Sequence, residues 1–418
     1  MSQERLQAPR GTYDVLPDEA AARAAVEAVA RRVLEGAGYR RIETPAFEQT
    51  ELFARGVGAS TDIVRKEMYS FDDGSGRSLT LRPEGTAPVV RAYVEHGMHK
   101  LPQPVKHWYL GPFFRAERPQ AGRFRQFWQV GAEAIGAEDP AVDAELIVLL
   151  ASILQELEVT GVRLRIASLG TPAARAAYRD ELRAHLRAHE ERLSVDVRDR
   201  IDLNPLRAFD ADDPGTRAVM ETAPRLLDHL SQEDAEHFAA VRALIAAAGV
   251  VYEVDPTLVR GLDYYTRTVF EFTSDALGAQ SGVGGGGRYD GLVELVGGAA
   301  TPGCGWAAGI ERIRLAAVTQ PVAEPPVDLF VGLAGTDARP PAFALADEAR
   351  RARLAAQLEL AGRSLKGQLK HAGRLGARYV AIVDGAGVMQ LRDMDSGAQE
   401  ELSSGEVVAR ILRERGMA

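Results

Sequence analysis

Residues 105–133 read VKHWYLGPFFRAERPQAGRFRQFWQVGAE, two segments rich in aromatic residues that flank a charged loop at 115–125. The pattern predicts a β-hairpin. Because alternate residues of a strand face the same side, Arg115, Gln129 and Glu133 should share one face of it. An arginine held beside a carboxylate and an amide suits a phosphate or carboxylate ligand, because its planar guanidinium binds bidentately. A solvated hairpin tip is the competing interpretation.

Two other segments carry candidate binding chemistry. Arg260 stands in LVRGLDYY, residues 258–265, just before a strand-like run at 268–272. Glu84 stands in RPEGT, residues 82–86, where another strand-like run ends, and a carboxylate there could bind an ammonium group. A surface turn with tyrosines packed in the core explains the first segment as well, and an exposed turn is the commoner explanation of the second.

Glycine-rich segments at 282–287 (GVGGGG) and 303–308 (GCGWAA) match dinucleotide-binding patterns formally. The first leads into RYDG and not directly into an apolar helix, and the second has no opening βαβ unit, so a dehydrogenase is disfavoured. The glycines instead predict close approach of backbone to a flat ligand. Residues 303–313 predict a glycine-rich entry to a helix that carries Arg312. The chain holds no G-x-x-x-x-G-K-[ST] motif, so an ATP-using enzyme of this sequence is not a P-loop enzyme.

Shifts in composition predict the domain organisation. Residues 172–250 are rich in Ala, Leu, Arg and Glu and predict a largely helical subdomain, and the prolines at 321–326 indicate a linker. Beyond the linker, strands and helices alternate, which predicts a small α/β domain with a mostly parallel sheet. Its predicted strands are 327–333, 358–360 and 379–383, and its predicted helices are 341–356 and 364–376.

The last of these helices carries basic residues at four-residue spacing: Lys366, Lys370, Arg374 and Arg378. They lie on one helix face, with Ser364 as the predicted N-cap. No acidic residue occurs in the sequence between Glu359 and Asp384. Unopposed positive charge over this length favours a phosphate backbone as partner, and a solvated helix face is the alternative.

The composition of the 418-residue chain is typical of a globular protein of two or three domains, with 46% hydrophobic and 26% charged residues. The absence of an apolar run of about 20 residues and the polar first ten residues predict a cytosolic protein. A single cysteine, Cys304, excludes an intramolecular disulfide and a Cys-rich metal site. The net charge of −9 does not exclude a nucleic-acid partner, because phosphate binding follows local clusters of charge.

Together these segments resemble the class II aminoacyl-tRNA synthetases. The stretch 38–45 is similar to motif 1, the dimer-interface element; the Arg115 hairpin is similar to motif 2, and the glycine-rich approach to Arg312 is similar to motif 3. Within this class, the chain resembles the histidine-specific family most closely. The segments that carry this resemblance are LVRGLDYY, GRYDGL at 287–292, RGTYDVLP at 10–17 and RPEGT. Trp128 departs from the residue expected in the family, but on a strand it should face away from Gln129. The loop DGAG at 384–387 is shorter than is usual in the family.

The resemblance implies an α+β catalytic domain on an antiparallel sheet with a helical insertion, followed by an α/β anticodon-binding domain. The implied ranges are 1–165 and 251–320 for the catalytic core, 166–250 for the insertion and 327–418 for the anticodon-binding domain. It also implies a cytoplasmic homodimer. The implied histidine-binding residues are Glu84, Gly85, Thr86, Gln129, Glu133, Tyr264 and Tyr265. The residues implied to bind ATP are Arg115, Glu117, Arg123 and Arg312; Arg115 and Arg260 would be catalytic. The residues implied to contact tRNA are Arg118, Gln120, Lys366, Lys370 and Arg374.

The activity implied is ATP-dependent formation of histidyl-adenylate, followed by transfer of histidine to the 3′ end of its tRNA. Mg²⁺ would be carried by ATP, without a dedicated metal site in the protein. The alternative is the synthetase-like regulatory subunit of ATP phosphoribosyltransferase. That family lacks the C-terminal domain and typically lacks the Arg260 motif, and this chain has both.

Overall fold

The protein is described by a computed structural model, which covers residues 6–58, 61–278, 281–318, 327–335, 337–384 and 389–416. The chain divides into two compact units, residues 1–320 and 321–418. Within the ranges described, no helix has the length and apolar character needed to cross a membrane. The predicted linker at 321–326, and all but Asp384 of the loop 384–387, lie outside the described residues.

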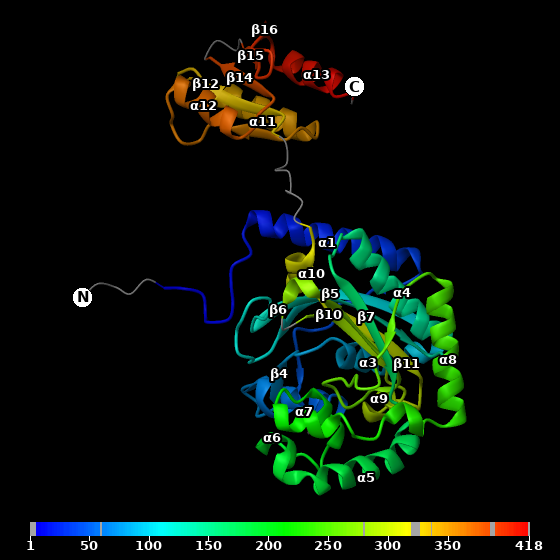
Figure 1. The fold of residues 1–418 in the computed structure, drawn as a ribbon. Helices are drawn as coiled ribbons and strands as arrows, with labels where there is room; N and C mark the ends of the chain where they lie inside the picture. Colours follow the sequence, from blue (N-terminus) through cyan, green and yellow to red (C-terminus); the bar gives the residue numbers. More distant parts are fainter. Residues whose placement is uncertain are drawn as a thin grey trace, which may run out of the picture. The chain divides into compact units, whose positions relative to one another are not determined.

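The first unit is built on an eight-stranded sheet in the order β1-β5-β6-β11-β10-β9-β7-β8, in which the predicted hairpin supplies the second and third strands (Figure 1). Strands β5 (Val105–Phe114) and β6 (Gln126–Ile135) pair antiparallel along their whole length. Antiparallel pairing continues from β6 through β11, β10 and β9 to β7, while β1 and β8 are short parallel strands at the edges. The antiparallel catalytic sheet is therefore confirmed. Its other strands are β1 (Arg40–Arg41), β7 (Val162–Ser168), β8 (Glu253–Val254), β9 (Thr266–Ser274), β10 (Gly282–Arg288) and β11 (Gly303–Gly309).

Both glycine-rich segments are strands of this sheet, β10 and β11. The prediction of a glycine-rich entry to a helix that carries Arg312 is confirmed, because helix α10 (Ile310–Ala316) begins directly after Gly309; the approach to it is strand β11. A Cβ on Gly286 would collide with the Gly305 carbonyl and with Trp306 on the neighbouring strand. Glycine there lets the two backbones lie against each other, and neither segment forms a phosphate-binding turn that opens a helix.

Four helices cover one face of the sheet: α1 (Pro17–Gly36), α4 (Pro140–Glu156), α8 (Gln232–Ala247) and α10 (Figure 1). Their apolar side chains form one core with Val130, Ala132 and Trp306 of the sheet. Trp128 packs against the same core, so it faces away from Gln129 as predicted. This face is closed by packing, which leaves the opposite face for a ligand.

The opposite face carries a small three-stranded sheet and several helices. The small sheet contains β2 (Phe47–Gln49), β3 (Tyr69–Asp72) and β4 (Ser78–Leu81), and beside it lie α2 (Thr50–Gly56), η1 (Ile63–Glu67), α3 (Thr86–Glu95), η2 (Met98–Lys100) and α9 (Leu292–Leu295).

The helical block follows β7. It contains α5 (Pro172–Ala188), η3 (Glu190–Arg192), α6 (Val195–Arg198), η4 (Pro205–Asp210), α7 (Pro214–Met220) and η5 (Leu226–His229). Strand β7 and helix α8 bound this block and belong to the main sheet and its core. A short η6 (Asp275–Leu277) follows β9.

The second unit, residues 321–418, has its own sheet and its own core. Strands β13, β12 and β14 are parallel as predicted, but β15 and β16 add an antiparallel half that the sequence pattern did not reveal. Its elements are β12 (Leu329–Leu333), α11 (Arg339–Arg351), β13 (Ala356–Leu358), α12 (Leu365–Arg374), β14 (Tyr379–Val383), β15 (Met389–Asp393), β16 (Gln399–Leu402) and α13 (Ser404–Glu414).

Candidate active site

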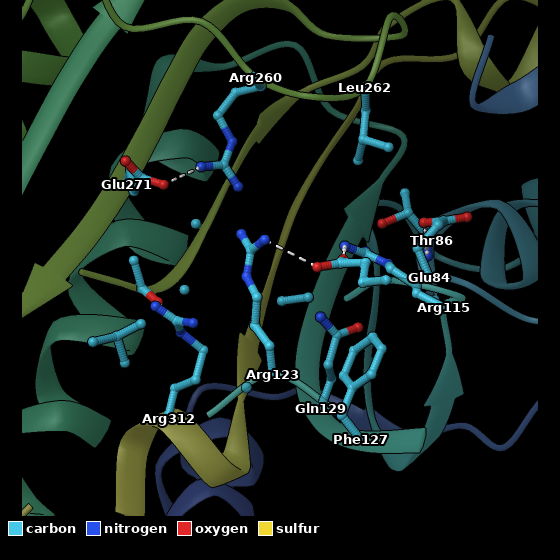
Figure 2. Close-up of a pocket in the computed structure, with 18 of the residues that line it drawn as sticks. Glu84, Thr86, Arg115, Arg123, Phe127, Gln129, Arg260, Leu262, Glu271 and Arg312 are labelled. Carbon is cyan, nitrogen blue, oxygen red and sulfur yellow. Dashed lines mark hydrogen bonds and ion pairs between the residues drawn. The ribbon is translucent and has the colours of Figure 1, made fainter. Parts of the chain in front are cut away.

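A cavity of about 300 Å³ opens on the sheet face that the four covering helices leave free. Figure 2 shows that its side chains come from separate elements of the first unit. The lining brings together eleven of the residues singled out from the sequence: Glu84, Gly85, Thr86, Arg115, Glu117, Arg123, Gln129, Arg260, Tyr264, Tyr265 and Arg312. Segments separated by more than 200 positions in the sequence therefore meet in one site.

Four arginines converge on this cavity: Arg115, Arg123, Arg260 and Arg312 (Figure 2). Arg115 and Arg123 share the carboxylate of Glu117, at N–O distances of 3.6 and 3.0 Å. The described lining of the cavity holds these four cations and three carboxylates, those of Glu84, Glu117 and Glu271. Such a cavity favours a polyanionic ligand.

Arg260 is held by an acidic residue that the sequence analysis did not select. Its Nη1 donates to Glu271 Oε1 at 2.9 Å, and the other oxygen of Glu271 accepts from Arg165 at 2.5 Å. The Nε of Arg260 is buried and has no hydrogen-bond partner among the described residues. The signal for Glu271 was available, because it is the one acidic residue within the apolar run 268–272.

Arg312 lies in the first turn of α10, and its Nε donates to the carbonyl of Gly282. Burial lowers the pKa of Arg312 below its ordinary value, and the nearby charge of Arg123 lowers it further. Both effects disfavour the charged guanidinium, and a bound anion would offset them.

Glu84 lies at the start of α3 and accepts hydrogen bonds from the backbone N–H groups of Thr86 and Ala87, at 2.7 and 2.9 Å. Glycine is required at position 85, between Glu84 and Thr86, because a Cβ there would collide with the ring of Tyr109. The Oε1 of Gln129 is buried and, in the described part of the chain, accepts no hydrogen bond. A carboxylate and an amide oxygen at one end of the cavity suit a positively charged amino group.

Glu133 does not line the cavity, contrary to the sequence prediction. It is fully buried below the lining residues, where its carboxylate accepts hydrogen bonds from Thr86 Oγ1 (2.8 Å), Tyr109 (3.3 Å) and Tyr289 (2.6 Å). Burial raises the pKa of Glu133 to about 8, although these hydrogen bonds oppose the shift. Glu133 therefore reaches the cavity through Thr86.

Tyr264 and Tyr265 form the wall beside Thr86. Their rings meet edge to face at a centroid distance of 4.7 Å, and Tyr264 also contacts the ring of Tyr289 at 5.9 Å. Burial raises the pKa of Tyr265 to about 12. Both phenols are therefore neutral at physiological pH and can donate or accept a hydrogen bond.

The predicted tRNA-contacting residues lie outside the cavity. Arg118 and Gln120 are exposed at the tip between β5 and β6. In the second unit, Ser364 caps α12 as predicted, and Lys366, Lys370 and Arg374 are exposed. The expectation of unopposed charge is wrong for Arg378, which follows the helix and lies 3.6 Å from Glu414. Sequence spacing could not reveal this pair, because Glu414 lies 36 positions away.

Comparison with known proteins identifies both units. The family described as Histidyl-tRNA synthetase matches residues 11–313, and the family described as Anticodon binding domain matches residues 328–414. The Histidine--tRNA ligase of Desulforamulus reducens is 47% identical over 96% of this chain and 97% of its own length. That of Halorhodospira halophila is 49% identical over 94% of each chain.

The crystal structure of apo histidyl-tRNA synthetase from S. aureus is similar to this structure, with a TM-score of 0.81 and 35% identity, and it covers 97% of this chain and 100% of its own. An ATP phosphoribosyltransferase regulatory subunit/histidyl-tRNA synthetase from Bacillus halodurans shares the fold at 22% identity and a TM-score of 0.66. The higher identities favour the ligases over the regulatory subunit. The chain belongs to the histidyl-tRNA synthetase family of class II aminoacyl-tRNA ligases.

Proposed function

We propose that the cavity binds histidine and ATP side by side, joins them as histidyl-adenylate, and then passes histidine to the 3′-terminal adenosine of its tRNA. The observation that carries this proposal is that four arginines line the same cavity as an acceptor cluster formed by Glu84 and Gln129, with Arg115 beside Glu84 (Figure 2). The arginines suit a polyphosphate, and the acceptor cluster suits an amino group.

The acceptor end would hold the amino acid. Glu84 and the unpartnered Oε1 of Gln129 would bind the α-amino group, with the backbone at Gly85 and the hydroxyl of Thr86 beside them. Tyr264 and Tyr265 would enclose the imidazole ring. Glu133 would act from below, through Thr86. A polar pocket of this kind rejects apolar amino acids, because they would leave its buried polar groups unpaired.

The arginine end would hold ATP. Arg115 and Arg260 would bracket the α-phosphate and the histidine carboxylate, and Arg123 and Arg312 would hold the outer phosphates, with Glu117 orienting Arg115 and Arg123. The histidine carboxylate is already ionised, so its attack on the α-phosphorus needs no general base. Fixed cations lower the barrier, because they stabilise negative charge where it develops as pyrophosphate leaves.

The described residues hold no group of three or more His, Cys, Asp or Glu side chains that could bind a metal ion, although the carboxylates of Glu117 and Glu271 line the cavity. Both carboxylates already lie against arginines, so the ion would be carried on the phosphates of ATP. Bound there, Mg²⁺ would neutralise part of the phosphate charge.

The exposed tip residues Arg118 and Gln120 would contact the acceptor end of the tRNA. The exposed stripe of Lys366, Lys370 and Arg374 on α12 would contact its phosphate backbone. The helical block between β7 and α8 would be the insertion domain of the first unit. Since its substrate tRNA serves protein synthesis, we place the enzyme in the cytoplasm.

Pyrophosphate exchange tests this function. The protein should exchange labelled pyrophosphate into ATP only when histidine is present, whereas a regulatory subunit would not.

Replacing Glu133 with Gln should raise the KM for histidine about tenfold and change the KM for ATP less than about twofold, because only the histidine end loses an ionisable acceptor. The exposed Glu294→Gln variant is the matched control. Equal changes in both KM values would mean that Glu133 has a structural role only.

We also propose a homodimer that forms through the small sheet, whose strand β2 follows the segment similar to motif 1 (38–45) in the chain. Phe47 and Phe71 are 49% and 44% exposed, and their rings lie against each other at 6.1 Å on the small sheet. An exposed aromatic pair on a sheet is typical of an interface. Sedimentation at micromolar concentration should show twice the 45.1 kDa chain mass. A double change of Phe47 and Phe71 to Glu should yield monomers, while Phe343→Glu in the second unit should not; a monomeric wild type would contradict the proposal.

A further inference from the structure

Three segments meet beside the cavity at the tip of the β5–β6 hairpin: residues 6–16, the tip at 115–125, and α10. The N-terminal segment runs from α1 toward the tip in Figure 1. It turns at Thr12, whose N–H and hydroxyl both donate to the Pro9 carbonyl at 3.0 and 2.8 Å. The backbone N–H of Arg125 then donates to the carbonyl of Gly11 at 2.7 Å. The N-terminal segment is thereby joined to the arm of the hairpin that returns into β6.

The fit between this segment and the tip is close. Gly11 has a φ of +89°, and a Cβ on it would lie 2.8 Å from carbons of the Arg125 side chain and 2.9 Å from Pro119. The guanidinium of Arg125 also donates to the carbonyls of Arg10 and Glu117, each at 3.4 Å. Arg125 therefore joins the hairpin tip to the N-terminal segment outside the cavity. The N-terminal segment packs against the outer side of the tip.

Tyr13 connects the N-terminal segment to α10. Its ring lies 4.5 Å from the ring of Phe124, and its hydroxyl donates to Glu311 Oε1 at 3.1 Å. Phe124 follows Arg123 in the chain, and Glu311 precedes Arg312. One side chain therefore contacts the immediate neighbours of both arginines that we assign to the outer phosphates.

Glu311 is fixed on its other side as well. It is 6% exposed, and both of its oxygens accept from the backbone N–H of Trp128, at 3.1 and 3.0 Å. The pairing between β6 and β11 ends at Gln129 and Gly309. The carboxylate of Glu311 therefore accepts from the backbone N–H of Trp128 at the position where the next residue of β11 would have paired. Burial and the charge of Glu311 raise the pKa of Tyr13 to about 12, which keeps its hydroxyl a donor at neutral pH.

We propose that Tyr13 is a positioning residue for ATP: it fixes the hairpin tip against α10, so that Arg123 and Arg312 face the same polyphosphate. The inference rests on the phosphate role proposed for these two arginines. Tyr13 does not line the cavity, and it acts through Phe124 and Glu311. Small displacements of binding groups can weaken a charged contact many-fold, so a hydroxyl outside the cavity can control affinity within it.

The test compares KM values for ATP and for histidine in pyrophosphate exchange. Tyr13→Phe keeps the contact with Phe124 and loses the hydrogen bond, and it should raise the KM for ATP about fivefold to tenfold. Tyr13→Ala loses both contacts and should raise it about 30- to 100-fold. The KM for histidine should change less than about twofold in either variant. Tyr252→Phe is the control, because it removes a hydroxyl that donates to Arg242 elsewhere in the same unit.

Arg312→Ala separates the two hypotheses. If that variant leaves the KM for ATP unchanged, the proposed phosphate role is wrong, whatever the Tyr13 variants do. Suppose instead that Arg312→Ala raises the KM for ATP. The positioning role of Tyr13 is then overturned if Tyr13→Phe leaves the KM for ATP unchanged, or if Tyr13→Phe raises the KM values for ATP and histidine equally. Thermal unfolding of each variant identifies loss of folding, and Tyr13→Phe still decides the question if Tyr13→Ala does not fold.

Discussion

Replacing Arg260 with alanine is expected to lower the rate of histidine-dependent pyrophosphate exchange by about 10²–10³-fold, because a fixed cation would be lost beside the α-phosphate, where negative charge develops in the transition state. The structure supports this role, because Arg260 lines the cavity and its other face is held by Glu271 at 2.9 Å. The decrease should appear mainly in kcat, since the contact is strongest in the transition state.

Two further variants sharpen this experiment. Arg260→Lys keeps a positive charge but loses the planar fork, and should show an intermediate rate. Arg163→Ala, which removes an exposed arginine of β7 that pairs with Asp275, is the matched control and should be close to wild type. A folded Arg260→Ala protein with near-normal exchange would disprove the assigned mechanism.

Removing the second unit is expected to separate activation from transfer. A chain that ends at residue 318 keeps the whole cavity and the core around it, so histidine-dependent exchange should persist. Charging of tRNA should fall by about 10²-fold or more, because the contacts of the anticodon-binding domain would be lost. Thermal unfolding and sedimentation of the shortened chain would establish that it remains folded and keeps the oligomeric state of the full chain.

The basic stripe on α12 is tested in the full chain. Changing Lys366, Lys370 and Arg374 to Ala should weaken tRNA binding, and each lost phosphate contact should lower the slope of log affinity against log salt by about 0.7–0.9. A matched triple change of the exposed Arg339, Arg351 and Arg413 should leave the slope near the wild-type value. If the stripe variant keeps both affinity and slope, the stripe is a solvated helix face.

The sequence predicted the face of the sheet on which a side chain lies better than it predicted how deeply that side chain is buried. Strand alternation placed Arg115 and Gln129 on one face, and both line the cavity. The same rule placed Glu133 with them, but alternation gives the side of the sheet and not what covers it. The hydroxyl of Tyr289, 156 positions later, and that of Thr86 enclose its carboxylate. Such a depth depends on tertiary packing, which strand period does not encode.

The second unit shows the same limit. Its parallel strands are short apolar runs, and the sequence revealed them. Residues 389–393 (MQLRD) and 399–402 (QEEL) are polar strands near the edge of the sheet, and pairing with β14 determines their conformation more than propensity does. The pair of Arg378 with Glu414 was missed for a related reason, because α13 had not been predicted.

The glycine strand β10 has a consequence for protein engineering. Part of the cavity floor consists of main chain at Gly282, Gly284 and Gly285, where a side chain would meet a neighbouring strand or Arg260. Substitutions at these glycines can therefore change the shape of the site very little. A library designed to make this enzyme accept histidine analogues should keep residues 282–287 fixed and vary wall positions such as Leu262 and Phe127, whose side chains can change size without separating two strands.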